Sequence, residues 1–365
     1  MNGIYIHIPF CKRKCKYCDF VSYAGRIDYA DAYLDVLECE MKKYAGEKAD
    51  TVFVGGGTPS VLSAKQLTRL TKSVFDTFDI AKSYEFTVEV NPGTLDARKT
   101  DAWLLGGVNR VSVGVQSFND TELRAVGRIH TSDEACRAVT DLSKAGFKNI
   151  SIDLMTALPD QTMDSLKNTL RTAVSLPITH ISAYSLIIED GTPLAEEYDA
   201  GTLNLPSEDE DREMYSYVID YLAENGFNQY EISNFAKEGY ECAHNIKYWT
   251  FEPYIGLGVA AHSFDGNNRA YNTSDFSEYT RGAEREVSAL TKRDRMSEFI
   301  ITGLRMNSGI SSSRFAELFG ETLEDAYGSI LTKFESMGLI KHAGDCYSLT
   351  RRGIDVSNSV LCEFV

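Results

Sequence analysis

The chain has 365 residues, of which 43% are hydrophobic and 25% are charged, a composition typical of globular proteins with about two or three domains. Its formal net charge of −16 argues against nucleic acid as a partner, because phosphate binding requires clustered Lys and Arg side chains. No apolar run is long enough to cross a bilayer and no signal peptide is recognisable, so we expect a cytoplasmic protein with at most peripheral membrane contact.

Six runs of β-branched and aromatic residues, each followed by a turn-rich polar segment, are predicted to be strands. These runs begin at Gly3, Thr51, Tyr84, Arg110, Asn149 and His180. The segments between them have a helical pattern, as in residues 28–46, where Gly46 is a plausible end of the helix. The strand–helix repeats favour a parallel α/β sheet, which we interpret as an incomplete TIM-like (β/α)6 barrel over residues 1–205. A doubly wound open sheet is the alternative.

The pattern changes after residue 205. Residues 206–290 are predicted to form an α/β extension that begins with a helix stopped by Gly226. Residues 291–365 contain predicted helices near 296–306, 312–319 and 323–337, followed by two short strands around a turn at Gly344. This combination indicates a winged-helix-like domain. Such domains often bind DNA, but the acidic charge of the chain favours a structural or partner-docking role.

The stretch CKRKCKYCDF places three of the eight cysteines, Cys11, Cys15 and Cys18, directly after the first predicted strand. In a cytoplasmic protein, cysteines are more often thiols or metal ligands than disulfides. A structural zinc site would need a fourth ligand, for which His7 is the nearest candidate, and ferredoxin-type clusters use a denser cysteine spacing. The C-x3-C-x2-C spacing fits a 4Fe–4S cluster held by three thiolates, with one iron left open for a small molecule. A loop of spare cysteines is the remaining alternative.

This stretch resembles the cluster loop of radical S-adenosylmethionine (SAM) enzymes. In that family the open iron binds SAM, and an electron splits the bound SAM to a 5′-deoxyadenosyl radical. The resemblance implies that Cys11, Cys15 and Cys18 hold a 4Fe–4S cluster and that SAM occupies the open iron.

Polar residues that could hold the nucleotide follow the next predicted strands. The loop VFVGGGTPS has neither the Walker A nor the dinucleotide-binding pattern, but its glycines would let the backbone approach a ligand closely. Glu89 is a carboxylate on an otherwise apolar strand and suits ribose hydroxyls. Gln116, Arg128 and Asp153 form a second polar set near the fourth and fifth strands. For the glycine loop, the alternative is a plain strand-to-helix turn. For Glu89, the alternative is a structural salt bridge.

These stretches resemble those of oxygen-independent coproporphyrinogen III oxidases and of the related HemW-type heme chaperones, from Tyr5 nearly to the C-terminus. The resemblance implies that the cluster-bound SAM is contacted by Tyr5, Gly56 and Glu89. It implies a second SAM site lined by Gln116, Arg128 and Asp153, with Gly57 and Thr58 between the two nucleotides. Relatives commonly have glycines where this chain has Ala157 and Asp160, a departure that bears on the second site.

Three features favour the chaperones over the oxidases. The oxidases have a further cysteine two residues after the third, where this chain has Phe20, and a long extension before the cluster loop. In addition, HNIKYW matches the HNxxYW motif associated with the chaperones. This match implies a heme site formed by His244, Asn245, Tyr248 and Trp249. Cys242 and His262 are competing candidates for the axial ligand of the heme iron.

The sequence therefore predicts a chaperone that carries a 4Fe–4S cluster, one or two SAM molecules and heme, and that delivers heme to acceptor proteins. The resemblance implies a low-potential electron donor such as flavodoxin or ferredoxin, and a homodimer is a further hypothesis. The alternative is a radical SAM enzyme that acts on a tetrapyrrole, either by oxidative decarboxylation of coproporphyrinogen III or by opening a porphyrin ring. A third hypothesis is a zinc-stabilised barrel that binds a partner.

Overall fold

A computed structural model describes residues 1–365, and its largest feature is a twelve-stranded sheet. The six predicted strands lie side by side at its centre, parallel and in chain order. They are β1 (Asn2–Ile8), β4 (Lys48–Gly56), β5 (Asp79–Val90), β6 (Arg110–Gln116), β7 (Asn149–Thr156) and β8 (His180–Ser185). Along β1, Ile4, Ile6 and Ile8 are completely buried in the main core, and they alternate with Tyr5 and His7 on the opposite face.

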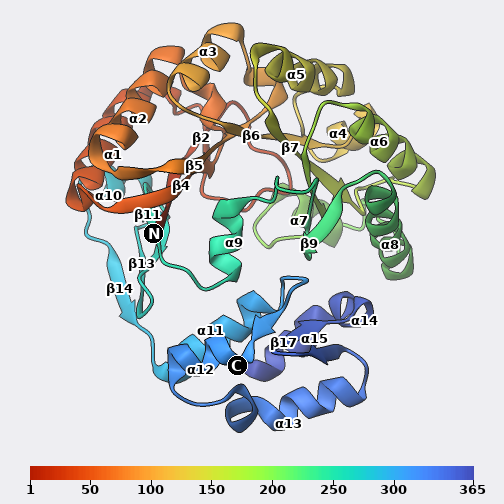
Figure 1. Cartoon of the computed structure of the whole chain (residues 1–365). Coiled ribbons are helices and arrows are strands. Elements are labelled where there is room, and N and C mark those ends of the chain that lie inside the picture. The colour runs from red at the N-terminus through yellow and green to blue at the C-terminus, as the bar shows by residue number, and fades with distance from the viewer.

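Helices cover the outer face of this curved sheet in an arc (Figure 1). They are α1 (Ala30–Met41), α2 (Ala64–Thr77), α3 (Ala97–Leu105), α4 (Asp120–Ala125), α5 (Ser132–Ala145), α6 (Met163–Ser175) and α8 (Glu208–Glu224), with the shorter α10 (Phe276–Thr280) beside α1. The short helix α7 (Pro193–Asp199) lies inside the arc, where the Leu194 amide donates a hydrogen bond to the Lys16 carbonyl. A capping box formed by Ser63 and Gln66 fixes the start of α2, and similar boxes precede α5, α6 and α8. The apolar faces of these helices and strands form one core of 49 buried residues.

Further strands extend both edges of the sheet. On one edge, β10 (Asn234–Ala236) and β9 (Asn228–Glu231) continue antiparallel from β8. On the other edge, β11 (Tyr254–Leu257) is parallel to β1, and β12 (His262–Phe264), β13 (Asn268–Tyr271) and β14 (Glu286–Ala289) follow antiparallel. The two edges do not pair, and α9 (Ala243–Trp249) lies in the gap between them (Figure 1). The expected incomplete barrel is therefore confirmed.

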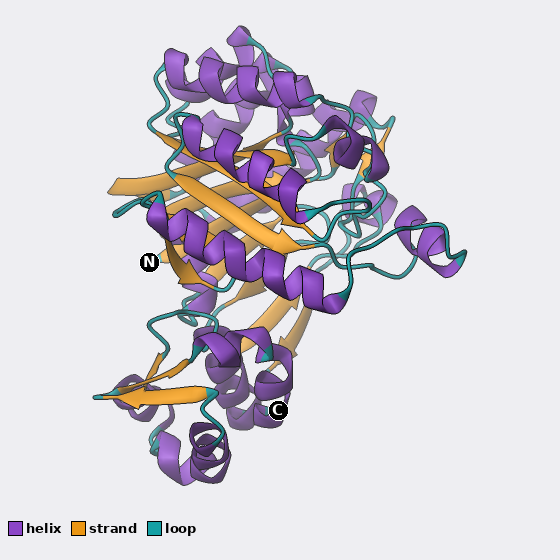
Figure 2. Ribbon diagram, turned by 90° about the vertical axis from the view of Figure 1, so that its right-hand side faces the viewer, coloured by secondary structure: helices purple, strands orange, loops and turns teal.

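The residues after 290 form a smaller helical domain below the sheet (Figure 2). The predicted helices are present as α11 (Lys292–Gly303), α12 (Ser312–Phe319) and α13 (Leu323–Ser336), and they pack around a second core of 18 buried residues. The predicted hairpin is formed by β16 (Ile340–Ala343) and β17 (Cys346–Leu349), with β15 (Ile310–Ser311) on the other side of β17. Two unpredicted short helices, α14 (Arg351–Asp355) and α15 (Ser357–Leu361), complete the domain. Nowhere in the chain does a helix have both the length and the apolar character required to span a membrane.

Candidate functional site

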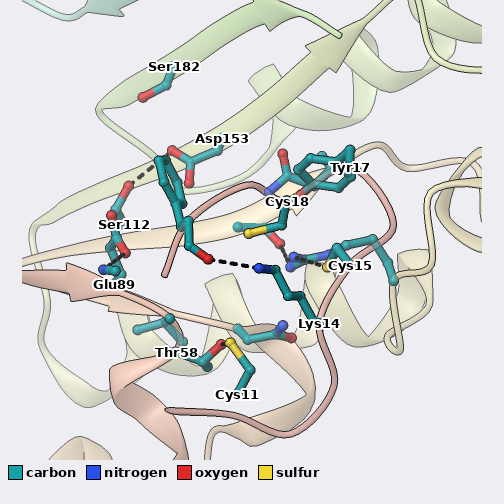
Figure 3. A pocket seen from close by; sticks show the side chains of 18 of the residues that line it. Cys11, Lys14, Cys15, Tyr17, Cys18, Thr58, Glu89, Ser112, Asp153 and Ser182 are labelled. Atoms are coloured by element: carbon teal, nitrogen blue, oxygen red, sulfur yellow. Dashed lines mark hydrogen bonds between the residues drawn. The ribbon is translucent and has the colours of Figure 1, made fainter. Parts of the chain in front are cut away.

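The three cysteines of the loop line one cavity. The short strands β2 (Phe10–Cys11) and β3 (Tyr23–Ala24) pair with each other and hold the two ends of the cysteine loop. Cys11, Cys15 and Cys18 are all free thiols, and they line a cavity of about 340 Å³ (Figure 3). The Cys18 amide donates a hydrogen bond to the Cys15 carbonyl over 3.3 Å, so these two thiols are held by a local turn.

His7 supports this loop from below. Its Nε2 lies 2.7 Å from the carbonyl oxygen of Val21, and because a carbonyl can only accept, Nε2 carries the proton. Its Nδ1 is therefore the acceptor for the Tyr5 hydroxyl, 3.0 Å away. Burial lowers the pKa of His7, which favours this neutral form. With both nitrogens engaged, His7 anchors the cysteine loop and is not available as a fourth metal ligand.

The donor set fits an iron–sulfur cluster better than a single ion. No three His, Cys, Asp or Glu side chains anywhere in the chain converge closely enough to hold one metal ion. A four-iron cluster is larger than one ion, so its three thiolates stand further apart around it. Three free cysteines that line one cavity, with no site for a single ion among them, fit such a cluster.

The glycine loop after β4 packs directly against the strand that leads into Cys11. The amides of Gly57 and Thr58 donate to the carbonyls of Ile8 and Phe10, over 2.9 and 2.8 Å. A Cβ on Gly57 would lie 2.9 Å from both carbonyl oxygens, so only glycine permits this approach. The Thr58 hydroxyl then lies 3.5 Å from the Cys11 sulfur. The glycines therefore position a thiol, in addition to any contact they make with a nucleotide.

Two carboxylates lie in the same cavity. Glu89 accepts a hydrogen bond from the Gly56 amide over 3.0 Å, and Asp153 accepts one from the Ser112 hydroxyl over 3.1 Å (Figure 3). Burial, together with the nearby Asp153 charge, raises the pKa of Glu89 to about 8. Burial also raises the pKa of Asp153, although hydrogen bonds from Ser112 and Ser182 oppose this effect. A cationic or hydroxyl-rich ligand would relieve the cost of ionising these groups.

The second polar set lies beside the cysteines. Arg128 Nη1 is 3.4 Å from the Cys15 sulfur, and its Nη2 donates to the Gly114 carbonyl. The Nε of Arg128 is buried without a hydrogen-bond partner, which leaves one donor for a ligand. Gln116, whose backbone has φ +70°, accepts a hydrogen bond from the Tyr184 hydroxyl over 3.2 Å. A left-handed backbone at a non-glycine residue is strained and is often found at ligand sites.

The structure gathers most of the predicted cluster and SAM residues at this cavity. It is lined by Cys11, Cys15, Cys18, Gly56, Gly57, Thr58, Glu89, Gln116, Arg128 and Asp153. Tyr5 is the exception, because it lies on the other side of His7 and borders a different cavity. The sequence reasoning missed Tyr17, Ser112 and Ser182, which also line the site. For the two serines, the two-residue alternation along RVSVGV and HISAYS was a signal that could have found them.

The four residues of the HNxxYW motif do not face one site. His244 is only 1% exposed; its Nδ1 is 3.0 Å from the Thr51 hydroxyl and its Nε2 is 2.8 Å from the Tyr248 hydroxyl. Burial and the Lys247 charge lower its pKa to about 3. Asn245 lines the cluster cavity, whereas Tyr248 and Trp249 line the cavity that Tyr5 borders. Ligation of heme by His244 stays a prediction, and it requires the imidazole to give up one of these two hydrogen bonds so that a nitrogen is free to bind iron.

The start of α9 is held in place by one carboxylate. Glu85 accepts hydrogen bonds from the amides of Ala243 and His244, each over 3.0 Å. Its Oε1 also lies 3.5 Å from the sulfur of Cys242, which is completely buried. An anion at a helix N-terminus is stabilising, so Glu85 holds α9 in the gap between the two edges of the sheet. Cys242 has no access to a ligand in this arrangement.

Comparisons with known proteins agree with this geometry. The family model of the radical SAM superfamily matches residues 5–173, and that of the HemN C-terminal domain matches residues 290–356. The heme chaperone HemW of Lactococcus lactis subsp. lactis is 39% identical, over 100% of this chain and 97% of that protein. This chain belongs to the HemW family. HemW of Bacillus subtilis is 38% identical, over 100% of this chain and 99% of that protein.

Among solved structures, the chain is similar to coproporphyrinogen III oxidase (HemN) from Escherichia coli, a radical SAM enzyme. It has a TM-score of 0.87 and 25% identity, and the match covers 99% of this chain and 89% of that chain. The radical SAM fold and the resemblance to HemW that the sequence indicated are confirmed. The roles of the individual cluster, SAM and heme residues stay predictions.

Proposed function

We propose that this chain binds heme and delivers it to acceptor proteins, and that it carries a 4Fe–4S cluster and SAM in the cluster cavity. The observation that carries the proposal is the full-length similarity to heme chaperones, at 39% identity over 100% of the chain. The match covers 100% of this chain and 97% of that chaperone, so the cargo site is expected within the matched residues.

The cluster cavity supports the binding of an open-iron cluster and a nucleotide. Cys11, Cys15 and Cys18 supply three thiolates, and neither a fourth cysteine nor a histidine lines the cavity with them. When bound, the cluster would supply an electron to the SAM sulfonium. The protein would orient the nucleotide through the backbone of Gly56 and the carboxylate of Glu89, which already lie 3.0 Å apart. The proposal includes a second SAM, held by Gln116, Arg128 and Asp153.

Heme delivery is tested with the full-length protein, reconstituted with iron and sulfide under anaerobic conditions and loaded with heme. The loaded protein is mixed with increasing concentrations of a purified apo-heme protein, and the shift of the Soret band is followed with time. Delivery by contact predicts that the transfer rate rises with acceptor concentration. A rate that is independent of acceptor concentration would show passive release, and failure to take up heme would remove the basis of the proposal.

A second candidate function is supported by the fold match to HemN, which is a coproporphyrinogen III oxidase. The cluster cavity, at about 340 Å³, is at the low end of the ~300–1,000 Å³ typical of small-molecule sites, so a tetrapyrrole substrate would have to lie outside it. Anaerobic reduction with SAM and coproporphyrinogen III decides between the functions. Formation of protoporphyrinogen together with 5′-deoxyadenosine would support the oxidase; SAM cleavage without a changed tetrapyrrole would exclude it.

The electron donor belongs to the same proposal. Lys12, Arg13 and Lys14 are exposed on the cluster loop, in a chain whose net charge is −16. An acidic, low-potential protein such as flavodoxin or ferredoxin would be attracted to this basic segment. Reduction of the cluster by such a donor should slow as ionic strength rises. At low ionic strength, Lys12→Glu should be reduced more slowly than the wild type. A cytoplasmic location and a homodimer also stay predictions.

A further inference from the structure

A second cavity shares Phe20 with the cluster cavity. It has a volume of about 660 Å³ and is bordered by the cluster loop, the end of α9, and strands β11 to β13. Its walls are rich in aromatic rings. Tyr248 and Tyr254 form an edge-to-face pair at 4.6 Å, and Phe251 and Phe264 lie 4.5 Å apart. Flat apolar macrocycles pack well against such rings, so we call this the aromatic cavity.

One histidine of this cavity is free to bind a ligand. The chain has six histidines. Four of them are at most 5% exposed and have at least one ring nitrogen engaged in a hydrogen bond: His7, His130, His180 and His244. The remaining two are exposed, and each has its ring stacked on a tyrosine: His262 on Tyr271 at 5.5 Å, and His342 on Tyr347 at 4.0 Å. Only His262 borders the aromatic cavity with an unengaged imidazole.

The other side chains that could ligate iron in this cavity are already engaged. The hydroxyl of Tyr5 is bonded to His7, that of Tyr248 to His244, and that of Tyr254 to Arg269. No cysteine lines the cavity. His262 is therefore the one strong heme-iron ligand that the cavity offers without breaking an existing hydrogen bond.

The aromatic cavity also connects the two features that carry the proposed function. Phe20 borders both this cavity and the cluster cavity. Tyr248 and Trp249, from the HNxxYW motif, form part of its wall, and the Trp249 Nε1 is buried without a hydrogen-bond partner. An unpartnered indole N–H can donate a hydrogen bond to a polar group of a bound ligand.

We propose that heme binds in the aromatic cavity with His262 as an axial ligand of its iron. This assignment rests on the proposed heme-delivery function and names the site at which the cargo is held. The charged groups on the wall are Asp19, Glu252 and Arg269, and the guanidinium of Arg269 is already paired with Glu298 at 2.8 Å. The heme propionates therefore face solvent, where the carboxylates do not repel them. A cargo held by one exposed histidine and by aromatic contacts is accessible to an acceptor protein.

The test is an anaerobic titration of reconstituted full-length protein with hemin, followed by absorption and resonance Raman spectroscopy. For His262→Ala, we expect the affinity for heme to fall at least about tenfold and the histidine–iron signature to be lost, and free imidazole to restore that signature. His342→Ala is the matched control, because His342 is also exposed on a strand and stacked on a tyrosine, but it lies in the C-terminal domain. It should bind heme as the wild type does.

Unchanged affinity and unchanged spectra in His262→Ala would overturn the assignment to this histidine. A second variant tests the cavity itself. Thr302 lies on the cavity wall, so Thr302→Trp should block heme uptake without reducing the iron content of the cluster. Thr302→Ser should take up heme as the wild type does. Wild-type uptake by Thr302→Trp would place the heme elsewhere. If the wild-type protein takes up no heme, the proposed function fails, and this outcome is distinct from a failure of the His262 assignment alone.

Discussion

Replacement of Glu89 by Gln tests the electrostatics of the cluster cavity. Burial and the charge of Asp153 raise the pKa of Glu89 to about 8, so at pH 7 the carboxyl group is mostly protonated before a ligand binds. A carboxylate is a better acceptor for ribose hydroxyls than a carboxylic acid, and it attracts the sulfonium of SAM. Binding of SAM should therefore favour the ionised form and release the proton from Glu89.

The magnitude follows from this pKa. With a pKa of about 8, the ionised fraction of Glu89 is about one in eleven at pH 7 and about ten in eleven at pH 9. If only the ionised form binds well, the affinity for SAM should rise about tenfold between these pH values, which corresponds to about 1.4 kcal/mol. The affinity for SAM should rise with pH and not fall, because below pH 8 binding must include the cost of deprotonating Glu89, and this cost disappears above pH 8.

The assay is a calorimetric titration of reconstituted protein with SAM between pH 6.5 and 9, in buffers with different ionisation enthalpies, which reports protons released per SAM. The amino group of SAM is expected to titrate in the same range, near the ~7.7–8.0 of an α-amino group, so wild type and Glu89→Gln are compared. The wild type should release nearly one more proton at pH 7 than the variant and show the steeper pH dependence. Identical proton release in the two proteins would refute ionisation of Glu89 on binding.

Three further predictions concern local geometry. Ala157, at φ +56°, has a strained backbone, so Ala157→Gly should raise the free energy of unfolding in urea by about 1 kcal/mol; Asp160→Gly, at φ +60°, should gain less because aspartate tolerates this region. Gly57→Ala places a methyl group 2.9 Å from two carbonyl oxygens of the cluster-loop strand, so less iron should be retained after reconstitution. Gly93→Ala, whose Cβ would meet nothing closer than 3.8 Å, should retain iron normally. His244 has a pKa of about 3 when folded, so the unfolded chain binds the extra proton and stability falls as pH drops below about 6.5, by at most about 1.4 kcal/mol per pH unit; urea titrations at pH 5 and 7 should show a smaller loss for His244→Gln.

The gathering of the three cysteines and the polar residues at one cavity could be predicted from the sequence because parallel strands fix which residues are neighbours. In the observed register, Glu89 lies opposite Ser112, and Asp153 lies opposite both Gly114 and Ser182. Equal strand spacing and a two-residue side-chain alternation place these groups in one layer facing the barrel interior. A chemical motif at one strand end was therefore enough to indicate that polar residues on the following strands belong to the same site.

The position of the HNxxYW motif could not be predicted in the same way. The burial of His244 depends on Thr51, whose hydroxyl is 3.0 Å from the imidazole although the residues are 193 positions apart. Strand β11, only four residues long, joins β1 in parallel without a repeat of the strand–helix pattern that identified the other parallel strands. The aromatic cavity combines residues from three such distant segments, so no local pattern in the sequence indicates it.

Phe20 lies on the walls of both cavities, and its exposed ring could be covered by ligands bound in either of them. Its side chain is 62% exposed, which is costly for a large aromatic group that could otherwise be buried. Neither cavity alone covers it, because it forms part of the wall of both. Heme packed in the aromatic cavity and a cluster with its nucleotide in the cluster cavity would each cover part of this ring. By the resemblance, the oxidases have a thiol near this position. A phenyl ring in its place contributes apolar contact area and no redox chemistry, which is consistent with the proposed heme site.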